Sequence, residues 1–511
     1  MGGEPVQILR VIDGQRVEFK ETELQRILLA DDVKDKPVIV ISIAGSYRQG
    51  KSFLLSFFLR YLRSNDRTKW MEDTDAPLRG FKWRAGCERE TTGIMVWNEV
   101  FTMTDSNGEE VVVLLMDTQG TFDSKSTTKE SVTIFSLSMM TSSVQIYNVM
   151  NNIQEDHLQH LQFFAEYGRL AQKGNETRPF QKLLFLVRDW NWPDDYEFGF
   201  SGGRSLVESR LNITEEQAAE LRTLRQSILS CFSDIEGFLL PSPGEKVVRK
   251  KSFDGRLADI NEEFLVGLQE LVPSILAPEN LLAKQVKGKR LSCEQLMTFF
   301  RTYVEVFGGS GLPEPESVFL ATAKATNVAA LEQARKHYIS AMEQRPRRSL
   351  VRLQEFHLEK LTEAKKVFDD YPKMGGDVIS GTFMDILIKD LEELLSHFVE
   401  DEKEIIRKEQ EEKVERERER QEQQKREEEM RHEQLLEKLR QEAREAELKR
   451  EIEMLREQKT KIEQEQARDR EVDAKMERLK QEYNMKIELL ELKLAQMRNA
   501  SDKPPLICVI S

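Results

Sequence analysis

The stretch Gly45 to Ser52, GSYRQGKS, has the residue types and the spacing of a phosphate-binding loop. It matches G-x-x-x-x-G-K-S and lies between the apolar run VIVISIA and the helix-like run FLLSFFLRYLR. In such a loop the glycines allow backbone N–H groups to surround the phosphates. Lys51 then reaches the β and γ phosphates as a point charge, and the Ser52 hydroxyl binds Mg²⁺. The sequence therefore predicts a nucleotide triphosphate site with Mg²⁺. We expect the loop to contact the nucleotide through Gly45, Ser46, Tyr47, Arg48, Gln49, Gly50, Lys51, Ser52 and Phe53.

The metal side of such a site needs an acidic group at the end of a neighbouring strand. VVVLLMDTQG supplies it, because Asp117 ends an apolar run and begins the pattern D-x-x-G that finishes at Gly120. Asp117 is expected to bind Mg²⁺ or its water, and the Gly120 amide can sense the γ-phosphate. Between the two motifs, Thr91 and Thr92 lie in the window where a switch threonine would complete the Mg²⁺ shell.

Base recognition is expected at the end of a later strand. The run LLFLVRDW ends in Arg188 and Asp189, without the N-K-x-D of ordinary small GTPases. A carboxylate there can accept hydrogen bonds from the N1–H and 2-amino groups of guanine, donors that adenine lacks. The same two residues also fit a salt-bridged strand edge, so the residues alone favour GTP without deciding for it.

The elements that must position these residues alternate between strands and helices up to about residue 306. Val38 to Ala44, Val111 to Met116 and Leu183 to Val187 are near-continuous apolar runs, typical of central strands covered on both faces. With helical stretches between them, they predict an α/β fold with a mostly parallel sheet, a phosphate-loop domain over residues 1–306. A linker is expected over 307–317, where FGGSGLPEPES clusters glycine and proline.

Helical patterns dominate the rest of the chain. Residues 318–400 predict a bundle of three helices, with breaks at Gln344 to Pro346 and at Tyr371 to Gly376. Residues 401–500 predict a long charged helix whose apolar positions return between Leu448 and Met497. Such a stripe indicates either a coiled coil with a partner or a helix packed back on its own protein. Residues 501–511 form a tail that ends in Cys508, Val509, Ile510 and Ser511, a pattern for prenylation of the cysteine.

Composition excludes several classes of protein. The chain has 511 residues and a formal net charge of −14, which disfavours nucleic acid as a partner. Its four cysteines lie far apart, which indicates a reducing, cytoplasmic compartment. No apolar run approaches the 18 or more residues of a membrane span, and we expect none.

Several stretches resemble atlastins and the wider guanylate-binding-protein GTPases of the dynamin superfamily. They are GSYRQGKSFLL, GFKWRAGCERETTGI, DTQGTFDSKSTTKESVTIFSLSMMTSSVQIYN, EDHLQHLQFFAEYGRLA, FLVRDWNWP and FLLPSPGEKV. The resemblance implies a GTPase that uses Mg²⁺ and forms a homodimer through its G domains when GTP is bound. It also implies roles for single residues: Arg48 as an arginine finger in cis, Thr91 on Mg²⁺, Arg188 and Asp189 on guanine, and Pro241 to Val247 in the loop that covers the base. Arg48, Lys51 and Thr91 are the expected catalytic residues.

The C-terminal part departs from the atlastin pattern. Atlastins carry a transmembrane hairpin after the three-helix bundle and use it to fuse endoplasmic reticulum membranes, which puts fusion by this chain in doubt. Its charged helix and CVIS resemble the prenylated guanylate-binding proteins instead.

We therefore predict a GTPase that tethers or remodels intracellular membranes. A farnesyl group on Cys508 would hold it on their cytosolic face, with the endoplasmic reticulum as one candidate membrane. Two alternatives stay open: an interferon-type host-defence GTPase that coats pathogen membranes, and a GTP-gated coiled-coil scaffold.

Overall fold

The computed structural model describes residues 3–12, 16–46, 49–83, 91–120, 127–164, 178–250, 252–309, 313–466 and 473–501. The chain divides into two compact units, residues 1–399 and residues 400–511.

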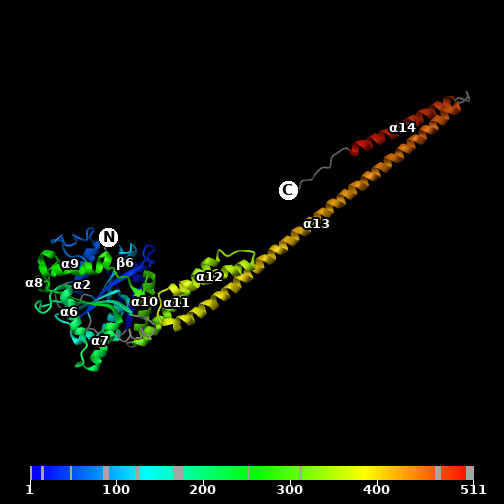
Figure 1. The fold of residues 1–511 in the computed structure, drawn as a ribbon. Helices are drawn as coiled ribbons and strands as arrows, with labels where there is room; N and C mark the ends of the chain where they lie inside the picture. The colour runs from blue at the N-terminus through cyan, green and yellow to red at the C-terminus, as the bar shows by residue number, and fades with distance from the viewer. Residues whose placement is uncertain are drawn as a thin grey trace. The chain divides into compact units, whose positions relative to one another are not determined.

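One mixed sheet lies at the centre of the first unit (Figure 1). Within the described residues its order is β2-β1-β4-β6-β3-β7-β8-β9, and β5 also pairs with β6. Neighbouring strands from β6 through β3, β7 and β8 to β9 are parallel, so their carboxyl ends meet at one edge. The strands are β1 (Pro5–Ile12), β2 (Arg16–Phe19), β3 (Val38–Gly45), β4 (Ile94–Trp97), β5 (Phe101–Thr104), β6 (Glu110–Thr118), β7 (Val144–Met150), β8 (Phe180–Arg188) and β9 (Phe232–Leu240).

Helices cover both faces of this sheet and join its strands. They are α1 (Glu21–Leu28), α2 (Lys51–Arg63), α3 (Thr128–Thr141), α4 (Glu155–Gln159), α6 (Gly199–Leu211), α7 (Ala219–Cys231), α8 (Glu245–Arg249), α9 (Glu262–Leu276) and α10 (Cys293–Phe307). Short 3₁₀ turns (Leu257–Asp259 and Pro278–Asn280) and a small hairpin, β10 (Gln285–Val286) and β11 (Lys289–Arg290), also belong to the described α/β part of the unit. The fold class predicted from the alternating pattern is confirmed.

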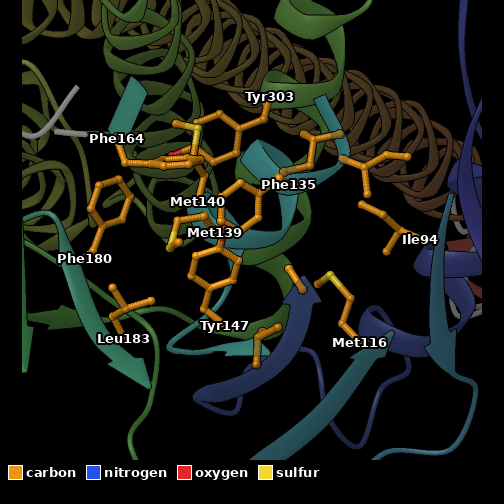
Figure 2. Packing of buried hydrophobic residues seen from close by; sticks show 14 of the residues in the cluster. Ile94, Met116, Phe135, Met139, Met140, Tyr147, Phe164, Phe180, Leu183 and Tyr303 are labelled. Atoms are coloured by element: carbon orange, nitrogen blue, oxygen red, sulfur yellow. The ribbon is translucent and has the colours of Figure 1, made fainter. Parts of the chain in front are cut away.

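The core lies on both faces because successive strand residues point to opposite sides. In β3, Ile39 and Ile41 join the apolar cluster that includes α2 and α9, whereas Val38 and Val40 join the cluster that includes α3 and α10. Figure 2 shows part of the second cluster, with Met116 from the sheet near side chains of α3. Double burial explains why the central strands are apolar without alternation.

A helical bundle follows the α/β part. It consists of α11 (Pro315–Met342), α12 (Leu350–Asp370) and the first part of α13 (Gly376–Gln466). Tyr338, Leu353 and Leu387, one from each helix, are fully buried in a common core. The helix breaks fall where proline and glycine predicted them, since those residues cannot continue a helix without cost.

The second unit contains the remainder of α13 and α14 (Asp473–Ser501) (Figure 1). Ile452 and Leu455 of α13 pack against Leu490 of α14, and Arg456 pairs with Glu491 at 2.9 Å. Of the two alternatives that the apolar stripe left open, the structure has the helix that packs back on its own chain. Among the described residues, no helix is long and apolar enough to cross a membrane.

Candidate functional site

The phosphate loop leaves the carboxyl end of β3 and leads into α2. Gly45 has a φ of 147°, and a Cβ there would lie 2.0 Å from the Asn148 carbonyl oxygen. Gly50 has a φ of 71°, and a Cβ there would lie 2.8 Å from Arg188 Nη1. Both positions therefore require glycine. α2 begins at Lys51, so the free N–H groups of its first turn lie beside the loop.

Lys51 is buried inside this loop. Its Nζ donates to the Gly45 carbonyl oxygen at 3.2 Å and to the Ser46 carbonyl oxygen at 3.0 Å. Burial lowers the pKa of Lys51 to about 8, although the nearby Asp117 acts in the opposite direction. A phosphate group would favour the charged form, so we expect Lys51 to hold its proton more tightly when a nucleotide binds.

Three oxygen-bearing side chains from different elements meet beside Lys51. Ser52 Oγ donates to Asp117 Oδ2 at 2.5 Å, and Thr91 Oγ1 donates to the same oxygen at 3.1 Å. The two hydroxyls are 3.1 Å apart. Thr92 instead accepts a hydrogen bond from Gln7 Nε2 through its own hydroxyl at 2.8 Å. The structure thus separates the two candidate threonines and places Thr91 at the site.

This oxygen cluster fits a Mg²⁺ ion. Asp117 Oδ1 is buried and has no hydrogen-bond partner among the described residues, which leaves a carboxylate oxygen available for a cation. Burial raises the pKa of Asp117 to about 6, while hydrogen bonds from Ser52 and the charge of Lys51 oppose that rise. One carboxylate with two hydroxyls suits Mg²⁺, which keeps several waters and binds substrate phosphates.

Gln119 links the D-x-x-G segment to the residues after Thr91. Its backbone N donates to the Gly93 carbonyl oxygen, and its side-chain Oε1 accepts from Gly93 N, both at 2.7 Å. Gln119 Nε2 donates to Glu130 Oε1 at 2.5 Å. Gly120, the predicted γ-phosphate sensor, follows directly and is buried. Sequence reasoning missed Gln119, which stands at a variable position of the motif.

Arg188 and Asp189 end β8 but occupy different environments. Arg188 is buried, lies over the Phe264 ring at 5.2 Å and donates from Nη1 to the Gln49 carbonyl oxygen at 3.2 Å. Burial lowers its pKa. Asp189 has a φ of 54° and is partly exposed. Arg188 therefore supports the phosphate loop, and of this pair it is Asp189 that is accessible to a base.

Asn148 is a second residue that the sequence did not reveal. It lies near the end of β7, and its Nδ2 donates to the Gln49 carbonyl oxygen at 3.0 Å. Its Oδ1 is buried without a partner in the described part of the chain. The signal available in the sequence was position alone, because the carboxyl ends of parallel strands converge at one edge.

The predicted base loop, Pro241 to Val247, lies at the same edge. Trp190 N donates to the Leu240 carbonyl oxygen at 3.1 Å, so the residue after Asp189 is bonded to the residue before this loop. Gly244 has a φ of 101° and precedes α8.

Comparison with known proteins gives matches over most of the chain. The model of the guanylate-binding protein N-terminal domain matches residues 15–285, and that of the C-terminal domain matches residues 283–404. Atlastin-2 of Homo sapiens is 47% identical over 401 residues, which cover 77% of this chain and 69% of that protein. Atlastin-1 of Bos taurus is 45% identical over 400 residues, which cover 77% and 72%.

The chain belongs to the guanylate-binding-protein family. As a member of this family of GTPases it is a GTP hydrolase. Membership agrees with the resemblance inferred from the motifs. Both family matches end by residue 404, so most of α13 and all of α14 lie beyond them.

Three predicted residues of this guanylate-binding-protein family member lie outside the described part of the chain. They are Tyr47, Arg48 and Cys508. The side chain of Phe53, another predicted contact, lies in an aromatic cluster with Trp83 at 4.9 Å between ring centroids. Phe53 therefore faces the core, and a contact with nucleotide would have to come from its backbone.

Proposed function

We propose that the protein is a Mg²⁺-dependent GTPase whose G domains pair when GTP is bound, and that this cycle acts at intracellular membranes. The observation that carries the catalytic part is the meeting of Ser52, Thr91 and Asp117 next to the buried Lys51. Four groups that a triphosphate and its metal require come from three separate segments and converge at one sheet edge.

Each of these side chains has a defined task in the proposal. Lys51 binds the β and γ phosphates as a cation, and the amides of the loop and of the first turn of α2 surround them. Ser52, Thr91 and Asp117 would hold Mg²⁺, which would supply positive charge against the negative charge that develops on the phosphates. Asp189 accepts from the guanine edge, and Pro241 to Val247 cover the base.

Arg48 is the proposed finger that stabilises the transition state in cis. Its place in the phosphate loop supports this role. In well-studied GTPases such a charge increases kcat by about 10³ to 10⁵-fold. If pairing of G domains directs Arg48 toward the phosphates, the rate per molecule should rise with protein concentration.

The test is GTP hydrolysis measured over a series of protein concentrations. Wild type should show a rising specific rate, Arg48→Ala should stay at the low-concentration rate, and Lys51→Ala should lose GTP binding. A specific rate that is flat for wild type would refute pairing. A normal rise in Arg48→Ala would refute the finger.

Membrane attachment is proposed to come from a farnesyl group on Cys508. The support is the pattern of Cys508 to Ser511, in which two aliphatic residues follow the cysteine as in prenylation motifs and the last residue, serine, favours farnesyl. One lipid chain binds membranes only marginally, so a dimer that carries two should bind more firmly through avidity.

Mass spectrometry of the protein from cells tests the modification directly. Membrane fractionation of wild type, Cys508→Ser and Lys51→Ala tests the coupling, with wild type expected to be retained best. An unmodified Cys508 would remove the lipid from the proposal, and equal retention of wild type and Lys51→Ala would contradict the coupling.

A further inference from the structure

A cavity lies at the sheet edge opposite the nucleotide site. It opens beside the amino ends of β8 and β9, where Phe180 and Ser233 line it, whereas Gly45 and Asp117 lie at carboxyl ends. The β10–β11 hairpin and α10 form its other walls, and its volume is about 130 Å³. Since one water needs roughly 10 to 15 Å³ of such cavity volume, the cavity has room for an ion of several heavy atoms.

The charged side chains that line this cavity are all cationic. They are Arg178, Lys284 and Lys287, and none of its described lining residues is an aspartate or glutamate. Lys284 is only 4% exposed and donates to the Ser142 carbonyl oxygen at 2.8 Å. No described carboxylate pairs with Lys284, and burial lowers its pKa to about 7. An ammonium has three donors, so a buried lysine with one backbone acceptor would gain from an anion beside it.

Lys287 is held beside the cavity by a two-residue turn. Lys287 has a φ of 50° and Gly288 a φ of 74°, the backbone conformation of a tight hairpin turn between β10 and β11. A lysine with positive φ is uncommon, and such an outlier is a reason to consider function. Lys287 forms no ion pair with a described residue. Burial lowers the pKa of Lys373 to about 8; Asp369 and Asp370 oppose this change, whereas the charges of Lys289 and Lys287 add to it, so Lys287 lies close enough to act on a second lysine.

Hydrogen bonds fix the Arg178 side chain and the backbone on both sides of Lys284. Gln181 Nε2 donates to the Ala283 carbonyl oxygen at 2.5 Å, and its Oε1 accepts from Gln285 N at 3.1 Å, so both neighbours of Lys284 are fixed to β8. Arg178 donates to the Ser233 carbonyl oxygen at 3.1 Å. The apolar wall includes Met140, Phe180 and Tyr303, which belong to the cluster shown in Figure 2. A preorganised cationic cavity with an apolar wall selects an anion by position as well as by charge.

We propose that this cavity is a second anion site that binds a phosphate-type oxyanion through Lys284, Lys287 and Arg178. The ligand's chemistry is a phosphate group, carried either by a free ion or by a phospholipid headgroup. The site is separate from the nucleotide and does not depend on the function proposed above.

The test uses the full chain with Lys51→Ala, so that the phosphate loop does not contribute. Inorganic phosphate is titrated against chloride at equal ionic strength while the unfolding temperature is followed. We expect a saturable rise specific to phosphate, by at least about 2 °C at saturation, because a ligand of the native state stabilises it. Added Lys287→Gln or Arg178→Gln should weaken the apparent affinity at least about threefold, and Lys284→Met should abolish the rise. Lys20→Gln is the matched control, because it also removes one exposed lysine charge. Lys20 follows β2, which lies at the other end of the strand order from β8 and β9.

The source of the phosphate is decided with vesicles of phosphatidylcholine with and without phosphatidic acid. Vesicle binding that requires phosphatidic acid and falls in Lys287→Gln assigns a headgroup. A rise in unfolding temperature with inorganic phosphate, but no binding to these vesicles, assigns a free ion. The proposal is overturned if phosphate gives no rise beyond chloride. It is also overturned if the apparent phosphate affinities of Lys287→Gln and Arg178→Gln equal that of Lys20→Gln. This comparison remains valid even if Lys284→Met does not fold.

Discussion

Gln119 and Gly93 bind each other at two points, through backbone and side chain, each at 2.7 Å. Gly93 has a φ of 68°, and a Cβ there would lie 1.8 Å from the Leu9 carbonyl oxygen, so only glycine fits where this segment packs on β1. Thr91 is two residues away. This clamp of Gln119 on Gly93 therefore fixes the segment of Thr91, a proposed metal ligand, through a residue that need not touch the metal.

The clamp predicts a charge swap that restores activity. Gln119→Glu keeps an acceptor for Gly93 N. It also replaces the Gln119 amide that donates to Glu130 in the wild type, so two carboxylates would face each other. We expect kcat to fall by about 10 to 100-fold and the Mg²⁺ requirement to rise, because small misplacements in such sites are costly. The double variant Gln119→Glu with Glu130→Gln should recover most of the loss. Steady-state kinetics over a Mg²⁺ series checks this, and a double variant no better than the single one would contradict the clamp.

Asp117 predicts two opposite responses to pH. Its folded-state pKa of about 6 is above the ordinary value of 3.8, so between these values the folded protein without metal holds more protons than the unfolded chain. The stability of the metal-free protein should therefore fall as pH rises from about 4 to 6 and then level off. Mg²⁺ needs the carboxylate, so Mg²⁺ affinity should rise roughly tenfold per pH unit below 6 and then flatten.

Denaturant unfolding without metal and Mg²⁺ titration across this range measure the two slopes. Asp117→Asn is the control, because an amide does not titrate. If both slopes survive in Asp117→Asn, another group is responsible.

Asp189 predicts a change of base preference. Asp189→Asn keeps the backbone, since asparagine tolerates the φ of 54° better than most residues. The amide loses the charged acceptor for guanine N1–H and 2-amino groups, so GTP binding should weaken by about tenfold or more. Xanthosine triphosphate offers an oxygen where guanine has the amino group, and its relative binding should improve. Competition binding with GTP, xanthosine triphosphate and ATP measures the preference, and an unchanged order would exclude Asp189 from the base.

The helical hairpin predicts a local effect in α14. Leu490 is 8% exposed and packs on Ile452 and Leu455, whereas Leu492, on the same helix, is 59% exposed. Leu490→Ala should weaken the contact by up to about 2 kcal/mol, the order of one buried leucine, and Leu492→Ala should leave it unchanged. Hydrogen exchange of α14 amides in the full chain reports the difference. Equal exchange in the two variants would mean that the apolar stripe does not hold α14.

The sequence predicted which residues meet at the candidate site where one residue type is required at one place. Glycine at positions 45 and 50, Lys51, Ser52 and Asp117 are such cases, because backbone geometry or charge leaves no alternative. Burial on both faces made β3, β6 and β8 visible as apolar runs. Gln119, Asn148 and the support role of Arg188 were not predictable, because they depend on which strand ends meet in space. The partner of the C-terminal stripe was equally hidden, since spacing shows that a helix face is apolar but not what covers it.

The return of α14 along α13 sets the reach of the chain's last residues. At 1.5 Å per residue, the 29 residues of α14 carry the chain back by about 43 Å from the hairpin's turn. Ser501 therefore lies beside the shaft of α13 rather than at its far end. A surface that meets the second unit at Ser501 would therefore meet it beside α13, about 43 Å along from the residue at which α14 begins.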